Sequence, residues 1–247
     1  MPKLSVITAC YNHGQYLAEC IDSVRGQTET DIEHIVIIDA ATDNSEDVAL
    51  SALEFVPNLR VWINKENRGL AASQNIGIHY AESPWVLKVD ADDKISPTYV
   101  EEIIHAANED HSRNVIFSPC QHFGARTDVW RYPKFDPSRM IDTFMIPGPA
   151  AFQKALWQAV GGYDETMRSA EDWDFYIRAH LAVGLVPHQL PEPRWHYRMH
   201  NGPRASREGM AKLPALQRYW RGHTRESVLA GSRSWGQWQA ERTMAHA

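Results

Sequence analysis

Cysteine, long apolar runs and surplus basic charge are all scarce in this chain of 247 residues. Its three cysteines are scattered and odd in number, which excludes a disulfide scaffold and favours a reducing, cytoplasmic location. No segment reaches the roughly 18–20 consecutive apolar residues of a membrane-spanning helix, so we expect at most peripheral membrane contact. The net charge of -6 argues against nucleic acid as a partner, because general affinity for it needs a basic surface.

Short apolar runs alternate with helical spacing along the first half of the chain. Buried strands are predicted at residues 4–8, 35–38, 61–63, 85–89 and 115–117, with helices between them. This alternation predicts an α/β fold, with a Rossmann-like, mainly parallel sheet and helices on both faces. Ligands of such sheets bind beyond the carboxyl ends of the strands. Two further helices are predicted at residues 152–160 and 171–181.

Three carboxylates, Asp90, Asp92 and Asp93, follow the predicted strand at residues 85–89. Like charges this close repel one another, and a hard divalent cation such as Mg²⁺ or Mn²⁺ relieves that repulsion. These ions keep positions for phosphate oxygens, so a nucleoside diphosphate is a natural partner. The alternative is a solvated turn that caps the next helix.

Two other strand ends carry polar or aromatic side chains. Asp39 closes the second predicted strand, where its carboxylate can accept a hydrogen bond from a nucleobase or a ribose. Tyr11 follows the first strand, where its ring can stack on a base or can simply pack. In a parallel sheet, Tyr11, Asp39 and Asp90 would meet at one edge.

Over roughly residues 3–202, several motifs resemble those of the family 2 glycosyltransferases and follow one another in that family's order. The stretch at 5–12 with Ser23 and Gln27 resembles the start of that family, and residues 90–93 resemble its DxD motif. Glu171-Asp172 resembles its ED motif, and Tyr197-Arg198-Met199-His200 resembles a downstream element that closes over the diphosphate. The other matching segments are Asn67-Arg68-Gly69-Leu70, Asn75-Ile76-Gly77, Pro147-Gly148-Pro149-Ala150 and the run at 161–165.

This resemblance implies a GT-A fold and a metal-dependent transfer, with inversion, of a sugar from a nucleoside-diphosphate donor, usually a UDP-sugar. The cofactor would be Mn²⁺ or Mg²⁺, and the acceptor a glycan, a lipid-linked glycan or another glycoconjugate. The implied base is Asp172, with Arg198 at the diphosphate and Asp92 and His200 at the metal. Acceptor-side residues would be Gly148, Glu171 and Trp173. The implied nucleotide-sugar contacts are Thr8, Ala9, Tyr11, Asn12, Asp39, Arg68, Gly69, Asn75, Asp90, Ala91 and Asp92.

The resemblance also divides the chain. We expect a catalytic domain over residues 1–202, with a nucleotide-sugar half at 1–117 and an acceptor half at 118–202. Residues 203–247 are rich in Arg and Trp, which predicts a basic helical tail that docks to a membrane surface or to a partner. The alternative is an ordinary helix packed on the core, with its tryptophans buried.

Two other functions compete with sugar transfer. A nucleotidyltransferase would normally carry a Gly-rich, basic phosphate loop after the first strand, but residues 11–14 contain neither Lys nor Arg. A non-catalytic relative that only binds nucleotide-sugars would be expected to lose Asp92 or Asp172, and both are present. The sequence therefore favours the enzyme.

Overall fold

The computed structural model describes residues 1–199, Gln217 and Trp220. His200, and almost all of the tail predicted at 203–247, lie outside the described residues. Within the described part of the chain, no helix is long and apolar enough to cross a membrane.

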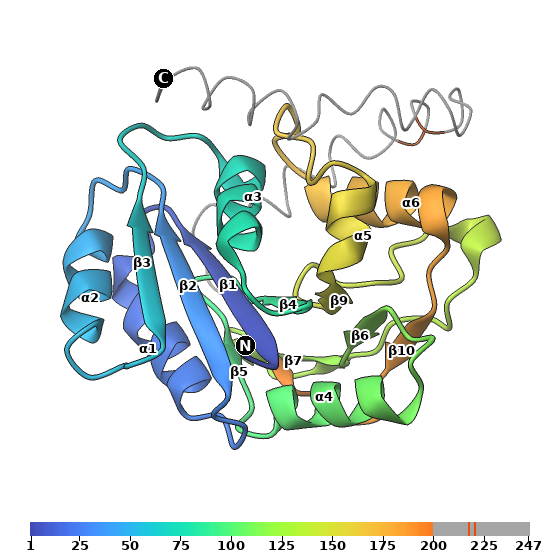
Figure 1. Ribbon diagram of the computed structural model, residues 1–247, viewed down its shortest axis with the longest axis horizontal. Coiled ribbons are helices and arrows are strands. Elements are labelled where there is room, and N and C mark those ends of the chain that lie inside the picture. The colour runs from blue at the N-terminus through green and yellow to red at the C-terminus, as the bar shows by residue number, and fades with distance from the viewer. Residues whose placement is uncertain (200–216, 218–219, 221–247) are drawn as a thin grey trace.

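A seven-stranded sheet forms the centre of the fold, in the order β10-β6-β9-β4-β1-β2-β3 (Figure 1). Its four parallel neighbours are β4 (Trp85–Lys88), β1 (Leu4–Cys10), β2 (Ile32–Ile38) and β3 (Leu59–Ile63). The remaining strands are β9 (Ala151–Gln153), β6 (Val115–Phe117) and β10 (Pro187–Gln189). This arrangement confirms the mainly parallel α/β fold.

Helices cover both faces of the parallel strands (Figure 1). Strand β2 shows why, because Ile35 and Ile37 join one apolar cluster while Val36 and Ile38 join the other. Alternate side chains of a strand point to opposite faces, so a strand that is apolar throughout needs cover on both sides. Helix α3 (Leu70–Tyr80) covers one face, and α1 (Gly14–Arg25) and α2 (Ser45–Ala52) cover the other.

The second half of the chain adds a four-stranded sheet, in the order β5-β11-β7-β8. Its strands are β5 (Lys94–Ile95), β11 (Trp195–Met199), β7 (Cys120–Gly124) and β8 (Val129–Trp130). The helices here are α4 (Tyr99–Glu109), the short 3-10 helix η1 (Pro137–Arg139), α5 (Lys154–Ala159) and α6 (Glu171–Val183). Helix α6 confirms the helix predicted from residue 171.

The helix predicted over residues 152–160 is wrong at its start, since β9 occupies Ala151–Gln153 and α5 begins only at Lys154. Strand β9 runs antiparallel to both β4 and β6 and pairs with each of them. Ala151 and Phe152 are fully buried there, so an apolar run that is compatible with a helix became a central strand. Tertiary pairing decided between the two structures.

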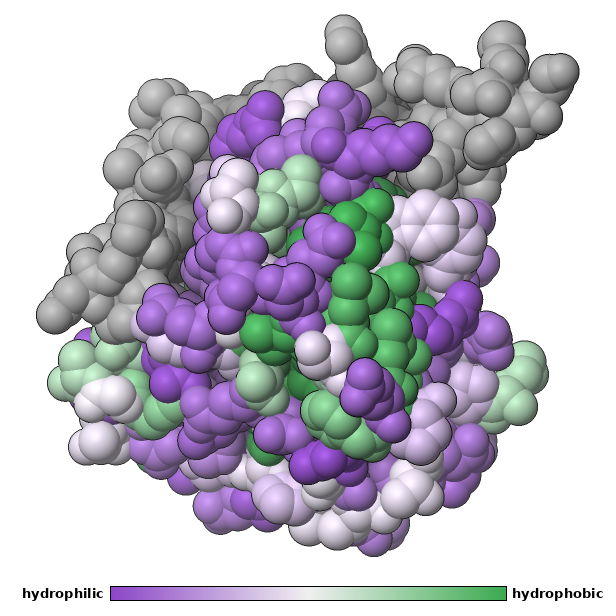
Figure 2. All heavy atoms as spheres, turned by 90° about the vertical axis from the view of Figure 1, so that its left-hand side faces the viewer, coloured by the Kyte–Doolittle hydropathy of each residue, from purple (hydrophilic) through white to green (hydrophobic). Residues whose placement is uncertain are grey.

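One surface carries exposed apolar side chains next to polar ones (Figure 2). Large apolar residues that stay exposed on and beside α2 and β3 are Leu50, Leu53, Phe55 and Ile63. The Arg25 guanidinium lies 5.5 Å from the centre of the Phe55 ring and shields part of it. Scattered exposure of this kind is ordinary for a folded protein.

Close approach of α3 to the sheet depends on Gly77. A Cβ atom there would lie 2.5 Å from Cγ2 of Ile7 and 2.7 Å from Cδ1 of Ile37. We expect Gly77→Ala to lower the free energy of unfolding by about 1–3 kcal/mol through overpacking. Urea denaturation would measure the change, with the exposed Ser51→Ala as a control expected within about 0.5 kcal/mol of the parent. Equal stability of the two variants would contradict this account.

Candidate active site

Three adjacent parallel strands end at the same edge of the sheet. Strand β1 pairs in parallel with β4 on one side and with β2 on the other. The segments that follow these strands carry Tyr11, Asp39 and Asp90. The Tyr11 side chain is 49% exposed, while Asp39 is buried. The topology thus brings the predicted stacking ring and two of the predicted carboxylates to one edge.

Asp39 is bound to the loop that follows β3. Its Oδ1 accepts hydrogen bonds from Asn64 Nδ2 at 2.8 Å and the Arg68 N–H at 2.9 Å, and its Oδ2 accepts one from the Gly69 N–H at 2.9 Å. A carboxylate offers about four acceptor positions, so roughly one remains for a ligand. Asp39 therefore shapes the Arg68-Gly69 segment, and Gly69 meets it with φ at +88°.

The loops after β1 and β2 are joined through Asn12. Its Oδ1 accepts a hydrogen bond of 2.7 Å from the Thr42 N–H, while Asn12 and Ala40 both have left-handed backbones, with φ at 57° and 52°. Non-glycine residues adopt that region at a cost and concentrate at functional sites. The same two loops carry Tyr11 and Asp39.

The carboxylates that follow β4 have distinct surroundings. Asp93 is fully buried, and its Oδ2 and Oδ1 accept hydrogen bonds from Trp195 Nε1 at 2.7 Å and from the Arg198 N–H at 2.8 Å. Loss of hydration raises the pKa of Asp90 to about 6, against the opposing effect of Lys88. The Asp92 side chain is 14% exposed, and His13 Nδ1 lies 4.0 Å from its Oδ1. Asp93 is thus structural, whereas part of the Asp92 side chain stays exposed.

Arg198 reaches the DxD segment from β11, over 100 residues further along the chain. Its Nε donates a hydrogen bond of 2.7 Å to the Asp92 carbonyl, and its guanidinium also pairs with Glu19. The rings of Tyr16 and Phe123 lie 4.6 Å and 4.4 Å from its guanidinium carbon. These contacts hold a cation beside Asp92, which is where the resemblance places the diphosphate.

Gly148 brings the second half of the chain against the strand ends. Strand β9 begins opposite Leu87, so the residues before it run beside the end of β4. A Cβ on Gly148 would lie 2.7 Å from Asp172 Oδ2 and 3.8 Å from Lys88 Nζ. The first distance is an overlap with the Asp172 carboxylate and the second is an ordinary contact, so both groups lie against Gly148 and Asp172 is close to the carboxyl end of β4.

Helix α6 begins with the acidic pair. Glu171 is 7% exposed, whereas Asp172 is partly exposed and accepts a hydrogen bond of 2.7 Å from the Trp173 N–H. Burial raises the pKa of Glu171 to about 7, with a further increase from the charge of Asp172. The N-terminus of a helix favours negative charge, which offsets part of this cost.

Three of the expected site residues direct their side chains into the protein. Asn75 bonds Tyr163 and Glu165 through its Nδ2, and its Oδ1 accepts from Trp157 Nε1 and the Tyr163 N–H. Thr8 Oγ1 lies 3.0 Å from His34 Nε2 inside the core. Ala91 is also buried. Asn75 thereby connects α3 to the loop before α6 and holds that loop in place.

Trp173 is buried on the far side of the acidic pair. Its ring centre lies 5.5 Å from that of Phe144 and 5.6 Å from that of Trp220, and Trp220 Nε1 donates a 3.2 Å hydrogen bond to Asp174. Trp220 is 3% exposed, so at this position of the expected tail the side chain packs on the core.

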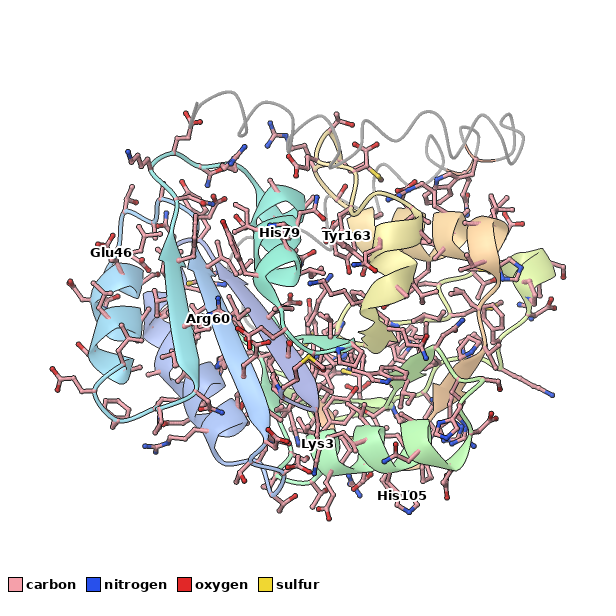
Figure 3. The ribbon with its side chains drawn as sticks, viewed as in Figure 1. Lys3, Glu46, Arg60, His79, His105 and Tyr163 are labelled. Atoms are coloured by element: carbon pink, nitrogen blue, oxygen red, sulfur yellow. The ribbon has the colours of Figure 1, made fainter. Side chains whose placement is uncertain are left out.

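Lys88 is the site residue that sequence reasoning did not assign. It is 3% exposed, and its Nζ lies 4.8 Å from the centre of the Tyr163 ring. Figure 3 shows Tyr163 between α3 and α5. Burial lowers the pKa of Lys88, but the charges of Glu171, Asp172 and Asp90 outweigh that effect and the pKa is raised. A lysine within the apolar strand at residues 85–89 was the available signal.

A metal would rest on few protein ligands here. Among the described residues, no three His, Cys, Asp or Glu side chains gather as a metal-binding group. A Mg²⁺ or Mn²⁺ ion bound through a nucleotide needs only one or two carboxylates, because phosphate and water oxygens complete its shell. The partly exposed carboxylate of Asp92 fits that requirement.

Solved structures share this architecture. The chain aligns with S. aureus TarS 1-349 in complex with UDP-GlcNAc at a TM-score of 0.72 and 22% identity, over 87% of this chain and 66% of that one. It also aligns with the mannosyltransferase PcManGT from Pyrobaculum calidifontis, in complex with GDP-Man and Mn²⁺. The TM-score is 0.69 and the identity 19%, over 95% of this chain and 69% of PcManGT. The fold is therefore that of the GT-A glycosyltransferases.

The family follows from the sequence comparison. Residues 5–170 match the model of glycosyl transferase family 2, and the chain belongs to this family. The putative glycosyltransferase EpsH of Bacillus subtilis (strain 168) is 30% identical over 220 residues, or 81% of this chain and 61% of EpsH. The uncharacterized glycosyltransferase YibD of Escherichia coli (strain K12) is 40% identical over 147 residues, or 60% of this chain and 42% of YibD. The chain thus spans less than two thirds of each relative.

Glu171 makes stability depend on pH. Because its folded pKa is raised, its contribution is fully present below the unfolded value of 4.5 and is lost as pH rises through about 7. We expect Glu171→Gln to gain about 1–3 kcal/mol relative to the parent between pH 4.5 and 8, measured by urea unfolding without divalent ions.

The control is Glu29→Gln, which removes a carboxylate whose pKa is lowered, chiefly by its hydrogen bond to Lys3. That contribution is lost as pH falls, so the control should change in the opposite direction and by less. An effect of Glu171→Gln that is the same at both pH values would refute the assignment.

Proposed function

We propose that the protein transfers a sugar, with inversion, from a nucleoside-diphosphate donor to an acceptor hydroxyl, and that Asp172 is the base. The approach of Asp172 to the end of β4 across Gly148 is the observation that carries this proposal. It sets a partly exposed carboxylate beside the strand ends where donors bind in folds of this type. The alternative of a relative that only binds the donor would leave that placement without a use.

The donor would lie across the ends of β1, β2 and β4. Tyr11, half exposed, is positioned to stack on a base, and the Asp39-bound loop of Arg68 and Gly69 would border it. TarS holds UDP-GlcNAc and PcManGT holds GDP-Man on the same fold. We propose a UDP-sugar, and a screen of both nucleotides for diphosphate release tests the choice.

The leaving diphosphate would be held at the DxD segment. Asp92 offers a carboxylate for Mn²⁺ or Mg²⁺, with His200 as a second proposed ligand, and a bound divalent ion would take up charge on the departing group. Arg198, fixed on the Asp92 carbonyl, supplies positive charge from the other side. Both groups stabilise charge that grows during bond breaking.

In the proposed reaction, Asp172 accepts the proton of the acceptor hydroxyl as its oxygen attacks the anomeric carbon. The new bond forms on the face opposite the leaving group, so a single displacement inverts the configuration. The bond to the diphosphate breaks, and its electron pair leaves with the diphosphate. Glu171, next to Asp172 in the chain, is buried, which suits a supporting role.

Nucleotidyl transfer is less consistent with the start of α1. The Gly14 N–H donates a 2.9 Å hydrogen bond to Asp43 Oδ2, so a carboxylate occupies the position where a phosphate loop would bind phosphate.

The acceptor is proposed to be a glycan, a lipid-linked glycan or another glycoconjugate. A cytoplasmic location is proposed because Cys10, Cys20 and Cys120 are all buried as free thiols.

Asp172→Asn should lower kcat by about 10²–10⁴-fold, because a positioned base acts in the transition state. Donor affinity should change by no more than a few-fold, since the base contributes little to ground-state binding. Steady-state release of nucleoside diphosphate and donor titration would measure the two effects separately.

Two matched variants test this assignment. Glu171→Gln should cost less activity than Asp172→Asn. Asp174→Asn should lower stability, because Asp174 pairs with the buried Arg178 at 2.7 Å, while the folded fraction keeps its kcat. If Asp172→Asn turned over normally and either neighbour did not, the base would be that neighbour.

Chelation should abolish transfer. Exhaustive EDTA treatment is expected to stop diphosphate release and added Mn²⁺ or Mg²⁺ to restore it, because the crowded carboxylates and the leaving group both need a cation. Asp92→Asn should shift the metal titration to higher concentration, whereas the exposed Asp47→Asn should not. Full turnover in EDTA would show that side chains alone neutralise the diphosphate.

A further inference from the structure

Lys88 carries an ammonium group that the proposed reaction does not use. Its side chain is 3% exposed, and among the described residues it makes no hydrogen bond or ion pair. The nearest recorded contact is the ring of Tyr163, 4.8 Å from Nζ. The charges of Glu171, Asp172 and Asp90 compensate that of Lys88, but its N–H donors have no acceptor among the described residues, and buried donors are normally paired.

Two buried hydroxyl groups share this environment. The Tyr163 ring contacts Lys88, and Tyr176 lies close enough to raise the Lys88 pKa. Neither tyrosine hydroxyl has a hydrogen-bond partner among the described residues. Buried polar atoms are rarely left in this state, and several together indicate a polar ligand. Lys88, Tyr163 and Tyr176 are therefore neighbouring polar groups that the described part of the chain leaves without hydrogen bonds.

The position of Lys88 identifies which part of a donor it would face. It lies against Gly148 on the same side as Asp172, and the acids that act on it are Glu171, Asp172 and Asp90. Arg198 instead binds the Asp92 carbonyl. If Asp92 and Arg198 hold the diphosphate and Asp172 faces the anomeric carbon, a group beside Asp172 meets the sugar.

We propose that Lys88 binds the donor sugar, with its ammonium donating hydrogen bonds to sugar hydroxyl oxygens beside Asp172. This inference rests on the proposed function. The three neighbouring carboxylates cancel its charge, so the ammonium acts as a hydrogen-bond donor to neutral oxygens rather than as an anion site. Lys88 thereby recognises the sugar, whereas residues at the strand ends bind the nucleotide.

The test compares a nucleotide with its own sugar conjugate. Calorimetry with Mn²⁺ would use UDP and UDP-glucose, and also GDP and GDP-mannose, and the pair that the wild type binds is carried forward. Lys88→Met should weaken binding of the nucleotide-sugar by about 10–100-fold, because a hydrogen bond from a charged donor is lost. The affinity for the nucleoside diphosphate should change by no more than about twofold.

Two more variants keep the result decisive. Lys88→Arg keeps the charge beside the carboxylates and should also weaken only the sugar conjugate, even if Lys88→Met fails to fold. Lys154→Met removes a lysine bonded to the carbonyls of His79 and Ala81 at the other end of β4, and should leave both affinities unchanged.

The outcomes separate the inference from the proposed function. Equal weakening of nucleotide and nucleotide-sugar in the Lys88 variants, or no weakening, would overturn the role of Lys88 while the donor class stands. If the wild type bound none of the four probes, the proposed function and this inference would both fail.

Discussion

Crowding of carboxylates at the end of β4 is the constraint on which the site depends. Asp90, Glu171 and Asp172 come together there, and the pKa values of Asp90 and Glu171 are raised to about 6 and about 7 chiefly by burial. Like charges in a poorly hydrated space repel strongly. Lys88 lies among them, so its cation lowers the cost of bringing the acceptor half onto the strand ends.

A strand from late in the chain stabilises a further carboxylate in the segment after β4. Strand β11 gives Asp93 two hydrogen-bond donors, the indole of Trp195 and the backbone of Arg198. Because β11 also pairs with β5 and β7, satisfying Asp93 fixes the second sheet against the first. A carboxylate that resembles part of a metal motif thus works as a structural anchor.

The sequence predicted the donor half well because its signals are local. Apolar runs with turn residues identified β1 to β4, and polar strand ends pointed to Tyr11, Asp39 and Asp90. In the second half the sequence predicts α6 and most of α5, but it places helix over part of β9 and gives no sign of β7, β8, β10 and β11. Their pairings join residues far apart in sequence, where periodicity carries little information.

What the sequence alone determined is the set of chemical groups: the family motifs, the acidic pairs and the strand ends that carry them. The tertiary structure decided which of those groups face one another. Asn75 resembled a donor contact, yet its amide is used within the protein. Lys88 is a strand residue, as predicted, but only the structure shows that its ammonium lies close to Asp172. Side-chain direction and burial depend on packing between distant segments, and no short stretch of sequence encodes them.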